Sequence, residues 1–188
     1  MIGERMNNDE NEYEIDFDAE VDRFFHDDSR TNEKPKIVII CGGICSGKTT
    51  LRRRDYSAGY VVLDAAEIFL SLSRGEYYDF PSIFEEPLDQ IGQLIALNAF
   101  QEGRNLVTEV IPLKFDLEAV LEAIKKVGYS VTLIQVDCDP EVGWQRNLDR
   151  GEDSISAAFT ESFHENWILN AVSILTSEDD DIVDIADN

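Results

Sequence analysis

Residues 36–49 read Lys36-Ile-Val-Ile-Ile-Cys-Gly42-Gly-Ile-Cys-Ser-Gly47-Lys48-Thr49. The residues between Lys36 and Gly42 are apolar and mostly β-branched, which predicts a buried strand of a parallel sheet. The rest matches the pattern G-x-x-x-x-G-K-[ST] in full, and a helix-forming stretch over residues 47–56 follows it. A strand, a glycine-rich turn and a helix in this order form the context in which that pattern binds phosphate. The sequence therefore predicts a phosphate-binding loop, or P-loop, at residues 42–49.

The residue types of this loop fit a nucleoside triphosphate. Successive backbone N–H groups converge on a phosphate in such a loop, and the helix that follows adds the positive end of its dipole. A side chain at Gly47 would obstruct that approach. Lys48 would reach the β- and γ-phosphates, and the Thr49 hydroxyl would complete the coordination of Mg²⁺. The residues expected to bind ATP or GTP are Gly42, Gly43, Ile44, Cys45, Ser46, Gly47, Lys48, Thr49 and Thr50.

Strands alternate with helices along the rest of the chain. Short apolar runs predict further strands over residues 60–64, 105–109, 131–136 and, near the end, 181–185. Helical spacing of apolar residues and capping signals predict helices over residues 87–102, 115–127, 140–150 and 159–175. This alternation is typical of an α/β fold, in which helices cover both faces of a parallel sheet.

The charge of the chain is strongly negative and unevenly distributed. The 188 residues include 16 basic and 39 acidic ones, for a net charge of −23. The acidic residues are concentrated in segments 1–33 and 176–188, which leaves residues 34–175 as the expected catalytic or binding domain. A field of this sign repels nucleic acids and anionic membranes. We therefore expect a small-molecule acceptor and not a polynucleotide.

The acidic N-terminal segment also contains apolar residues. Val21, Phe24 and Phe25 are spaced i, i+3, i+4, which predicts a short amphipathic helix. Such a helix either docks on the surface of its own domain or acts as an arm that binds a protein partner.

No apolar run is long enough to span a bilayer, the N-terminus lacks a signal-peptide pattern, and the cysteines form no CxxC pair. These features favour the cytoplasm.

Three acidic residues follow or end predicted strands, at the edge where ligands bind in open α/β sheets. Asp64 and Glu67 come after the second strand, and either could accept a proton from a substrate hydroxyl that attacks the γ-phosphorus. Their structural alternative is helix capping by Asp64, with Glu67 in the first turn. Glu109 ends the third strand and could hold Mg²⁺ through water, bind a substrate hydroxyl, or simply face solvent.

Two further groups of residues are candidates for ligand contacts. Arg146 and Arg150 lie at i, i+4 in a predicted helix, so both guanidinium groups could neutralise the γ-phosphate, or both could lie on an exposed face. Tyr77 and Tyr78 belong to an aromatic-rich segment that could stack on a base or sugar, or cover the core of the domain.

Several segments together resemble a known family. They are Gly42–Thr49, Leu63–Glu67, Asn105–Glu109, Gly128–Tyr129 and Arg146–Arg150. Over about residues 36–170 the chain resembles the zeta toxin family of P-loop kinases. Enzymes of this family phosphorylate a sugar hydroxyl of UDP-N-acetylglucosamine with ATP or GTP and Mg²⁺. The resemblance implies a sheet with strand order 2-3-1-4-5.

The resemblance also implies roles for individual residues. It places Lys48 and Thr49 on nucleotide and metal, and an acid after the second strand as the base. It places Glu109 on the substrate, and Arg146 and Arg150 on the nucleotide phosphates. The chain departs from the family after the third strand, where Glu109-Val-Ile replaces an acid-Gly-Thr turn. It also lacks the arginine expected near the acid after the second strand.

Other functions fit the same motifs. The segment from Arg146 to Gly151 is also similar to polynucleotide 5′-kinases, so a polynucleotide or nucleoside kinase is one alternative. A second alternative is a non-catalytic nucleotide-binding protein whose acidic ends engage a partner. The missing turn after Glu109 favours this second alternative.

Overall fold

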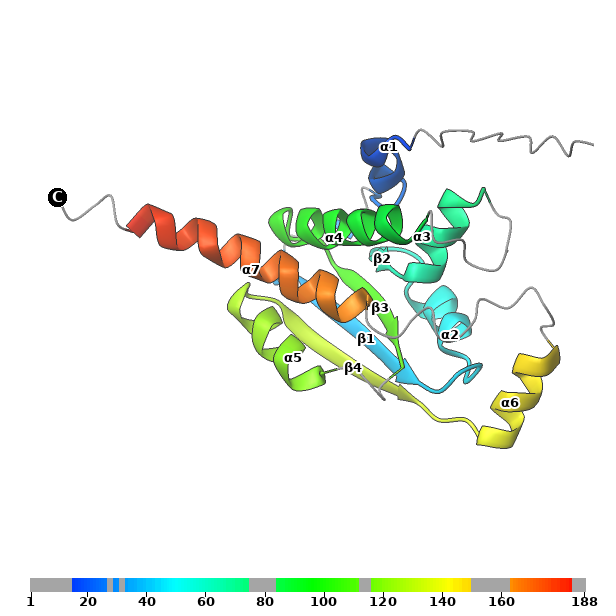
Figure 1. Ribbon diagram of the computed structural model, residues 1–188. Coiled ribbons are helices and arrows are strands. Elements are labelled where there is room, and N and C mark those ends of the chain that lie inside the picture. Colours follow the sequence, from blue (N-terminus) through cyan, green and yellow to red (C-terminus); the bar gives the residue numbers. More distant parts are fainter. Residues whose placement is uncertain are drawn as a thin grey trace, which may run out of the picture.

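A computed structural model describes residues 15–26, 29–30, 33–74, 84–111, 116–149 and 163–183. Its centre is a parallel sheet in the order β2-β3-β1-β4 (Figure 1). The strands are β1 (Lys36–Gly42), β2 (Val61–Leu63), β3 (Leu106–Val110) and β4 (Ser130–Val136). The α/β fold and the strand order 2-3-1-4 expected for these strands are therefore confirmed.

The expected fifth strand over residues 181–185 is wrong for the part of it that the structure describes. Residues 163–183 form one helix, α7 (Phe163–Val183), which continues well past the expected end at residue 175. No glycine or proline interrupts this stretch, so no residue stops the helix before the position of the expected strand. The sheet of the described residues consequently has β4 at one edge.

Helices cover both faces of the sheet. The remaining helices are α1 (Phe17–Asp22), α2 (Lys48–Asp55), α3 (Ala65–Leu72), α4 (Glu85–Gln101), α5 (Leu117–Lys126) and α6 (Pro140–Asp149). The larger core joins one face of the sheet to residues of α3, α4, α5 and α7. On the other face, Leu51 of α2 packs against Val38, Ile40 and Val107. Among the described residues, no helix combines the length and the apolar character needed to cross a membrane.

Alternation along β3 decides which face each of its side chains occupies. Leu106 and Val110 belong to the larger core, while Val107 belongs to the smaller core beneath α2. Because side chains of a strand alternate between faces, Glu109 lies on the same face as Val107. The carboxylate of Glu109, one residue before the end of β3 and not at its end as expected, therefore lies on the side of the sheet that α2 covers.

The N-terminal helix docks on the domain. Asp16 caps α1 by accepting a hydrogen bond from the Ala19 N–H, and Val21 lies in the larger core. Phe24 and Phe25 pack partly buried against the same core, although they follow the helix and are not part of it. Further along, the backbone of Asn105 donates to the carbonyl of Ser29. This arrangement agrees with the docked alternative for the stripe of apolar residues.

The interface between α4 and α7 depends on one glycine. Trp167 of α7 is fully buried, and its indole N–H donates to Asp89 of α4 at 2.7 Å. A Cβ at Gly92, one turn further along α4, would overlap the indole ring. Gly92 therefore provides the space that the largest buried side chain of the core occupies.

We expect Gly92→Ala to lower the free energy of unfolding by about 1–3 kcal/mol, the usual cost of overpacking a core. Helix propensity alone would stabilise the variant by about 1 kcal/mol, so a measured loss identifies the clash. Denaturant unfolding provides the measurement. In a Trp167→Leu background the same substitution should cost much less, because the ring is gone. A stability equal to or above that of the wild type would contradict this packing.

Candidate active site

The loop between β1 and α2 has a conformation that its glycines permit. Gly47 caps α2 with φ of 105°, in the left-handed region that favours glycine. A Cβ at Gly42 would lie 2.7 Å from the carbonyl oxygen of Val136, so this position requires glycine because the end of β4 lies so close. Cys45 also has a positive φ, of 53°. These angles curl the loop around the start of α2.

The polar groups of this loop fit a phosphate. The Lys48 ammonium donates to the carbonyl oxygens of Gly42 and Gly43, at 2.9 and 2.8 Å, and so lies over the loop. Burial lowers the pKa of Lys48, while the charges of Glu109 and Asp64 oppose that shift. Among the residues that the structure describes, the buried Ser46 hydroxyl has no hydrogen-bond partner. A phosphate would accept bonds from these groups and from the first N–H groups of α2.

A hydroxyl and a carboxylate beside this loop fit a divalent cation. Thr49 of α2 donates its hydroxyl to Oε2 of Glu109, at 2.8 Å. Hydroxyl and carboxylate oxygens are the ligands that Mg²⁺ takes from proteins when phosphates and waters supply the rest. Glu109 is only 7% exposed, so the solvent-facing alternative for this residue is wrong. The reason is that α2 covers the face of β3 on which Glu109 lies.

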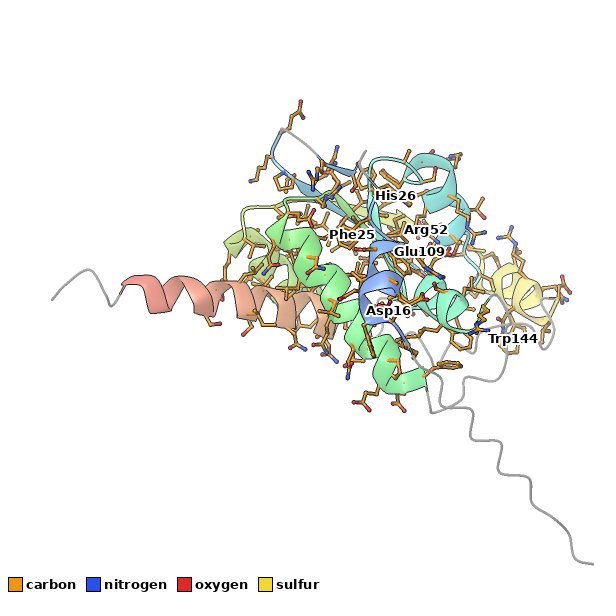
Figure 2. All side chains as sticks on the ribbon, turned by 90° about the horizontal axis from the view of Figure 1, so that it is seen from above. Asp16, Phe25, His26, Arg52, Glu109 and Trp144 are labelled. Carbon is orange, nitrogen blue, oxygen red and sulfur yellow. The ribbon has the colours of Figure 1, made fainter. Side chains whose placement is uncertain are left out.

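Arg52 of α2 links two of the three candidate carboxylates. Its Nε donates to Oε1 of Glu109 at 2.5 Å, and its Nη2 donates to Oε1 of Glu67 at 2.6 Å. Figure 2 shows Arg52 and Glu109 side by side in the interior, well away from Trp144 on α6. The Arg52 side chain is 5% exposed. Sequence reasoning missed this residue, although its position one turn after Thr49 places it on the same helix face.

Asp64 and Glu67 have different surroundings. Asp64 caps α3, because its Oδ1 accepts from the N–H groups of Ala66 and Glu67 at 2.9 and 3.0 Å. Burial raises the pKa of Asp64, and the charge of Arg52 offsets part of that rise. Burial acts in the same direction on Glu67, but hydrogen bonds from Arg52 and Arg53 hold its pKa below the ordinary value. The capping expected of Asp64 is confirmed.

Helix α6 brings one of the two expected arginines to the loop. Arg146 donates from Nη1 to the carbonyl oxygen of Cys45, at 3.4 Å. The close approach depends on Gly143, where a Cβ would lie 3.0 Å from the carbonyl oxygen of Ile44. Arg150, Tyr77 and Tyr78 lie outside the described residues, so their expected positions in the site stay predictions.

Several predicted site residues thus meet at one edge of the sheet. The register explains part of this convergence, since Leu63 pairs with Thr108 and the next residues are Asp64 and Glu109. The charge of Asp64 contributes, after burial, to the raised pKa of Glu109. The loop that carries Lys48 therefore faces the buried carboxylates of Asp64 and Glu109. This arrangement is suited to transferring a phosphoryl group and moving a proton.

Known proteins resemble this chain in sequence pattern and in fold. The family model described as Zeta toxin matches residues 21–184 of the chain. A search of curated proteins finds no match.

Solved structures share the fold at low sequence identity. A chain of the PezAT chromosomal toxin–antitoxin system of Streptococcus pneumoniae has a TM-score of 0.58 and 18% identity, over 71% of this chain and 61% of that one. A chain of the Pnkp1/Rnl/Hen1 RNA repair complex has a TM-score of 0.50 and 14% identity, over 79% of this chain and 47% of that one. This chain therefore spans less than two thirds of either structure.

Proposed function

Because this chain belongs to the Zeta toxin family, we propose that it is a P-loop kinase that transfers the γ-phosphate of ATP or GTP to a hydroxyl group of a small acceptor. The observation that carries the proposal is the convergence of Lys48, Thr49 and the buried carboxylates at one edge of the sheet. A module that only binds nucleotide has no need of a buried carboxylate able to take a proton.

The loop residues bind and orient the nucleotide in this proposal. Gly42 to Thr50 surround the phosphates, and Lys48 neutralises the β- and γ-phosphates once it leaves the loop carbonyls. Thr49 and Glu109 would hold Mg²⁺, which when bound neutralises charge on the phosphate oxygens. Arg146 contacts the loop from α6 and would stabilise charge on the transferring group.

Asp64 is the better candidate for the base. Its Oδ1 is occupied by two backbone N–H groups, while its Oδ2 has no hydrogen-bond partner among the described residues. Burial raises its pKa, which makes the carboxylate a stronger proton acceptor. Both arginine contacts of Glu67 fall on its Oε1 and stabilise the charged form. The acceptor hydroxyl would therefore transfer its proton to Asp64 as its oxygen attacks the γ-phosphorus.

The family supports a UDP-sugar as the acceptor, with UDP-N-acetylglucosamine the first to test. A net charge of −23 disfavours a polynucleotide, which the similarity to a chain of an RNA repair complex would otherwise suggest. We also propose a protein partner, since one similar structure comes from a toxin–antitoxin system. The acidic N-terminal segment is one surface that could contact it.

The test is a transfer assay with γ-labelled ATP and GTP. Separate reactions contain UDP-N-acetylglucosamine, a nucleoside, and an oligonucleotide with a free 5′-hydroxyl. Label in the sugar nucleotide is the expected result. Label in the oligonucleotide or the nucleoside would favour the alternative kinases. Nucleotide binding without transfer to any acceptor would favour the non-catalytic alternative.

We expect Arg146→Ala to lower turnover by about ten- to hundredfold, because hydrogen bonds to charged groups contribute about 1.5–3 kcal/mol. Nucleotide affinity should change less, since the arginine acts on charge that develops in the transition state. Rates at saturating nucleotide measure the effect. Gln145→Ala, on the same helix, is the control, since Gln145 is exposed and bonds to Asp149 of its own helix. Equal rates for the two variants would remove Arg146 from the mechanism.

A further inference from the structure

Arg52 is a buried cation to which the reaction above assigns no part. Its side chain is 5% exposed, and its partners Glu109 and Glu67 are 7% and 28% exposed. Burial of a charged group is costly unless its hydrogen bonds are satisfied, so such a residue requires an explanation. A lysine could supply the charge. Only a guanidinium can donate along two fixed directions, as Arg52 does from Nε and Nη2.

The two contacts of Glu109 define its orientation. One oxygen accepts from Arg52 and the other from the Thr49 hydroxyl. Both donors belong to α2 and lie one helical turn apart, so a rotation of the carboxylate would break both bonds. The Thr49 hydroxyl thereby keeps a carboxylate oxygen of Glu109 at 2.8 Å.

We propose that Arg52 is a positioning residue for the metal-bound nucleotide. Its guanidinium fixes Glu109 beside Thr49, so that the oxygen ligands of the metal are already in place when the nucleotide arrives. Its Nη2 holds the carboxylate of Glu67 in the first turn of α3. Asp64 is then the carboxylate that can accept the proton of the acceptor hydroxyl. This inference rests on the proposed function, since it concerns the same site.

The competing explanation is that Arg52 only stabilises the fold. A structural role predicts a lower melting temperature with unchanged nucleotide binding below it. A positioning role predicts weaker binding of the metal-bound nucleotide and little change for the metal-free nucleotide. Groups that orient metal ligands typically change metal affinity by about ten- to hundredfold when they are removed.

The experiment measures the dissociation constant of ATP, with Mg²⁺ and with EDTA, below the melting temperature of every variant. We expect Arg52→Met to weaken binding about ten- to hundredfold with Mg²⁺ and less than about threefold with EDTA. Arg52→Lys should lie between Arg52→Met and wild type. Arg54→Met is the matched control, because Arg54 belongs to the same helix, is 71% exposed and pairs with Asp55.

A double variant covers the case in which Arg52→Met does not fold. Arg52→Met/Glu109→Gln removes both buried charges, and its affinity for ATP with Mg²⁺ should equal that of Glu109→Gln alone, since the arginine acts through this carboxylate. Additive losses, or wild-type affinity in folded Arg52→Lys and Arg52→Met, would overturn the inference. Failure of the proposed function is distinguishable, because the wild type itself would then bind no ATP or transfer no phosphate.

Discussion

Lys48→Ala is expected to reduce phosphate transfer by about a thousandfold, because preorganised charge at the transferring group contributes about that much in enzymes. The fold should survive. Within the described part of the chain, the Lys48 ammonium bonds only to the carbonyl oxygens of Gly42 and Gly43, which belong to its own loop. Initial rates at saturating nucleotide and acceptor provide the measurement, and thermal unfolding checks the fold.

The control for this substitution is Lys125→Ala in the last turn of α5, where the side chain is exposed and outside the site. It should leave the rate within experimental error of the wild type. If the Lys48 variant kept more than about a tenth of the wild-type rate, the assigned role would be wrong, since that loss corresponds to less than about 1.4 kcal/mol of barrier.

Asp64→Asn should lower turnover by about 10²- to 10⁴-fold, the usual contribution of a general base. Asparagine caps helices as well as aspartate does, and its side-chain oxygen can keep the bonds to Ala66 and Glu67. The substitution therefore removes the basic oxygen and leaves α3 intact. Nucleotide affinity, measured separately, should change little.

Two comparisons make the result for Asp64 specific. Asp116→Asn changes another N-cap, at α5, whose side chain accepts from the Ala119 N–H, and it should not affect turnover. Glu67→Gln should reduce turnover less than Asp64→Asn, because Glu67 is already bound by two arginines. If Glu67→Gln were instead the more severe change, Glu67 would be the base.

The elements around the loop were predictable because their signals are local. Four apolar runs became β1 to β4, and the P-loop pattern lies between a strand and a helix as its sequence indicated. The helix predicted over residues 87–102 ends at a cap at Glu102, followed by Gly103 with φ of 62°. Periodicity and capping depend on neighbours a few residues away, so a single sequence contains them.

The contacts of the buried charges were not predictable in the same way. The run Arg52-Arg53-Arg54 looks like a basic helix end, which would favour the dipole of α2 from a solvated position. One member of the run is nearly as buried as the core, and another is largely exposed. Which arginine turns inward depends on where β3 places Glu109, and that is decided by pairing between distant strands.

The incorrect fifth strand has a comparable cause. Residues 181–185 read Asp-Ile-Val-Asp-Ile, and such a short run of apolar residues beside acids suits a short strand as well as the end of a helix. Short apolar runs are ambiguous between the two, and the preceding helix extends through residue 183. Because no glycine or proline lies between residues 163 and 183, α7 continues into the position of the expected strand.

The position of β1 has a consequence for protein synthesis. This strand is synthesised well before its partners in the sheet, which begin at Leu106 and Ser130. The segment around Ser29 likewise waits for Arg104 and Asn105. At a synthesis rate of about 5–20 residues per second, the strand that leads into the nucleotide loop stays unpaired for seconds. The sheet around the loop therefore cannot form until the residues of β3 and β4 have been translated.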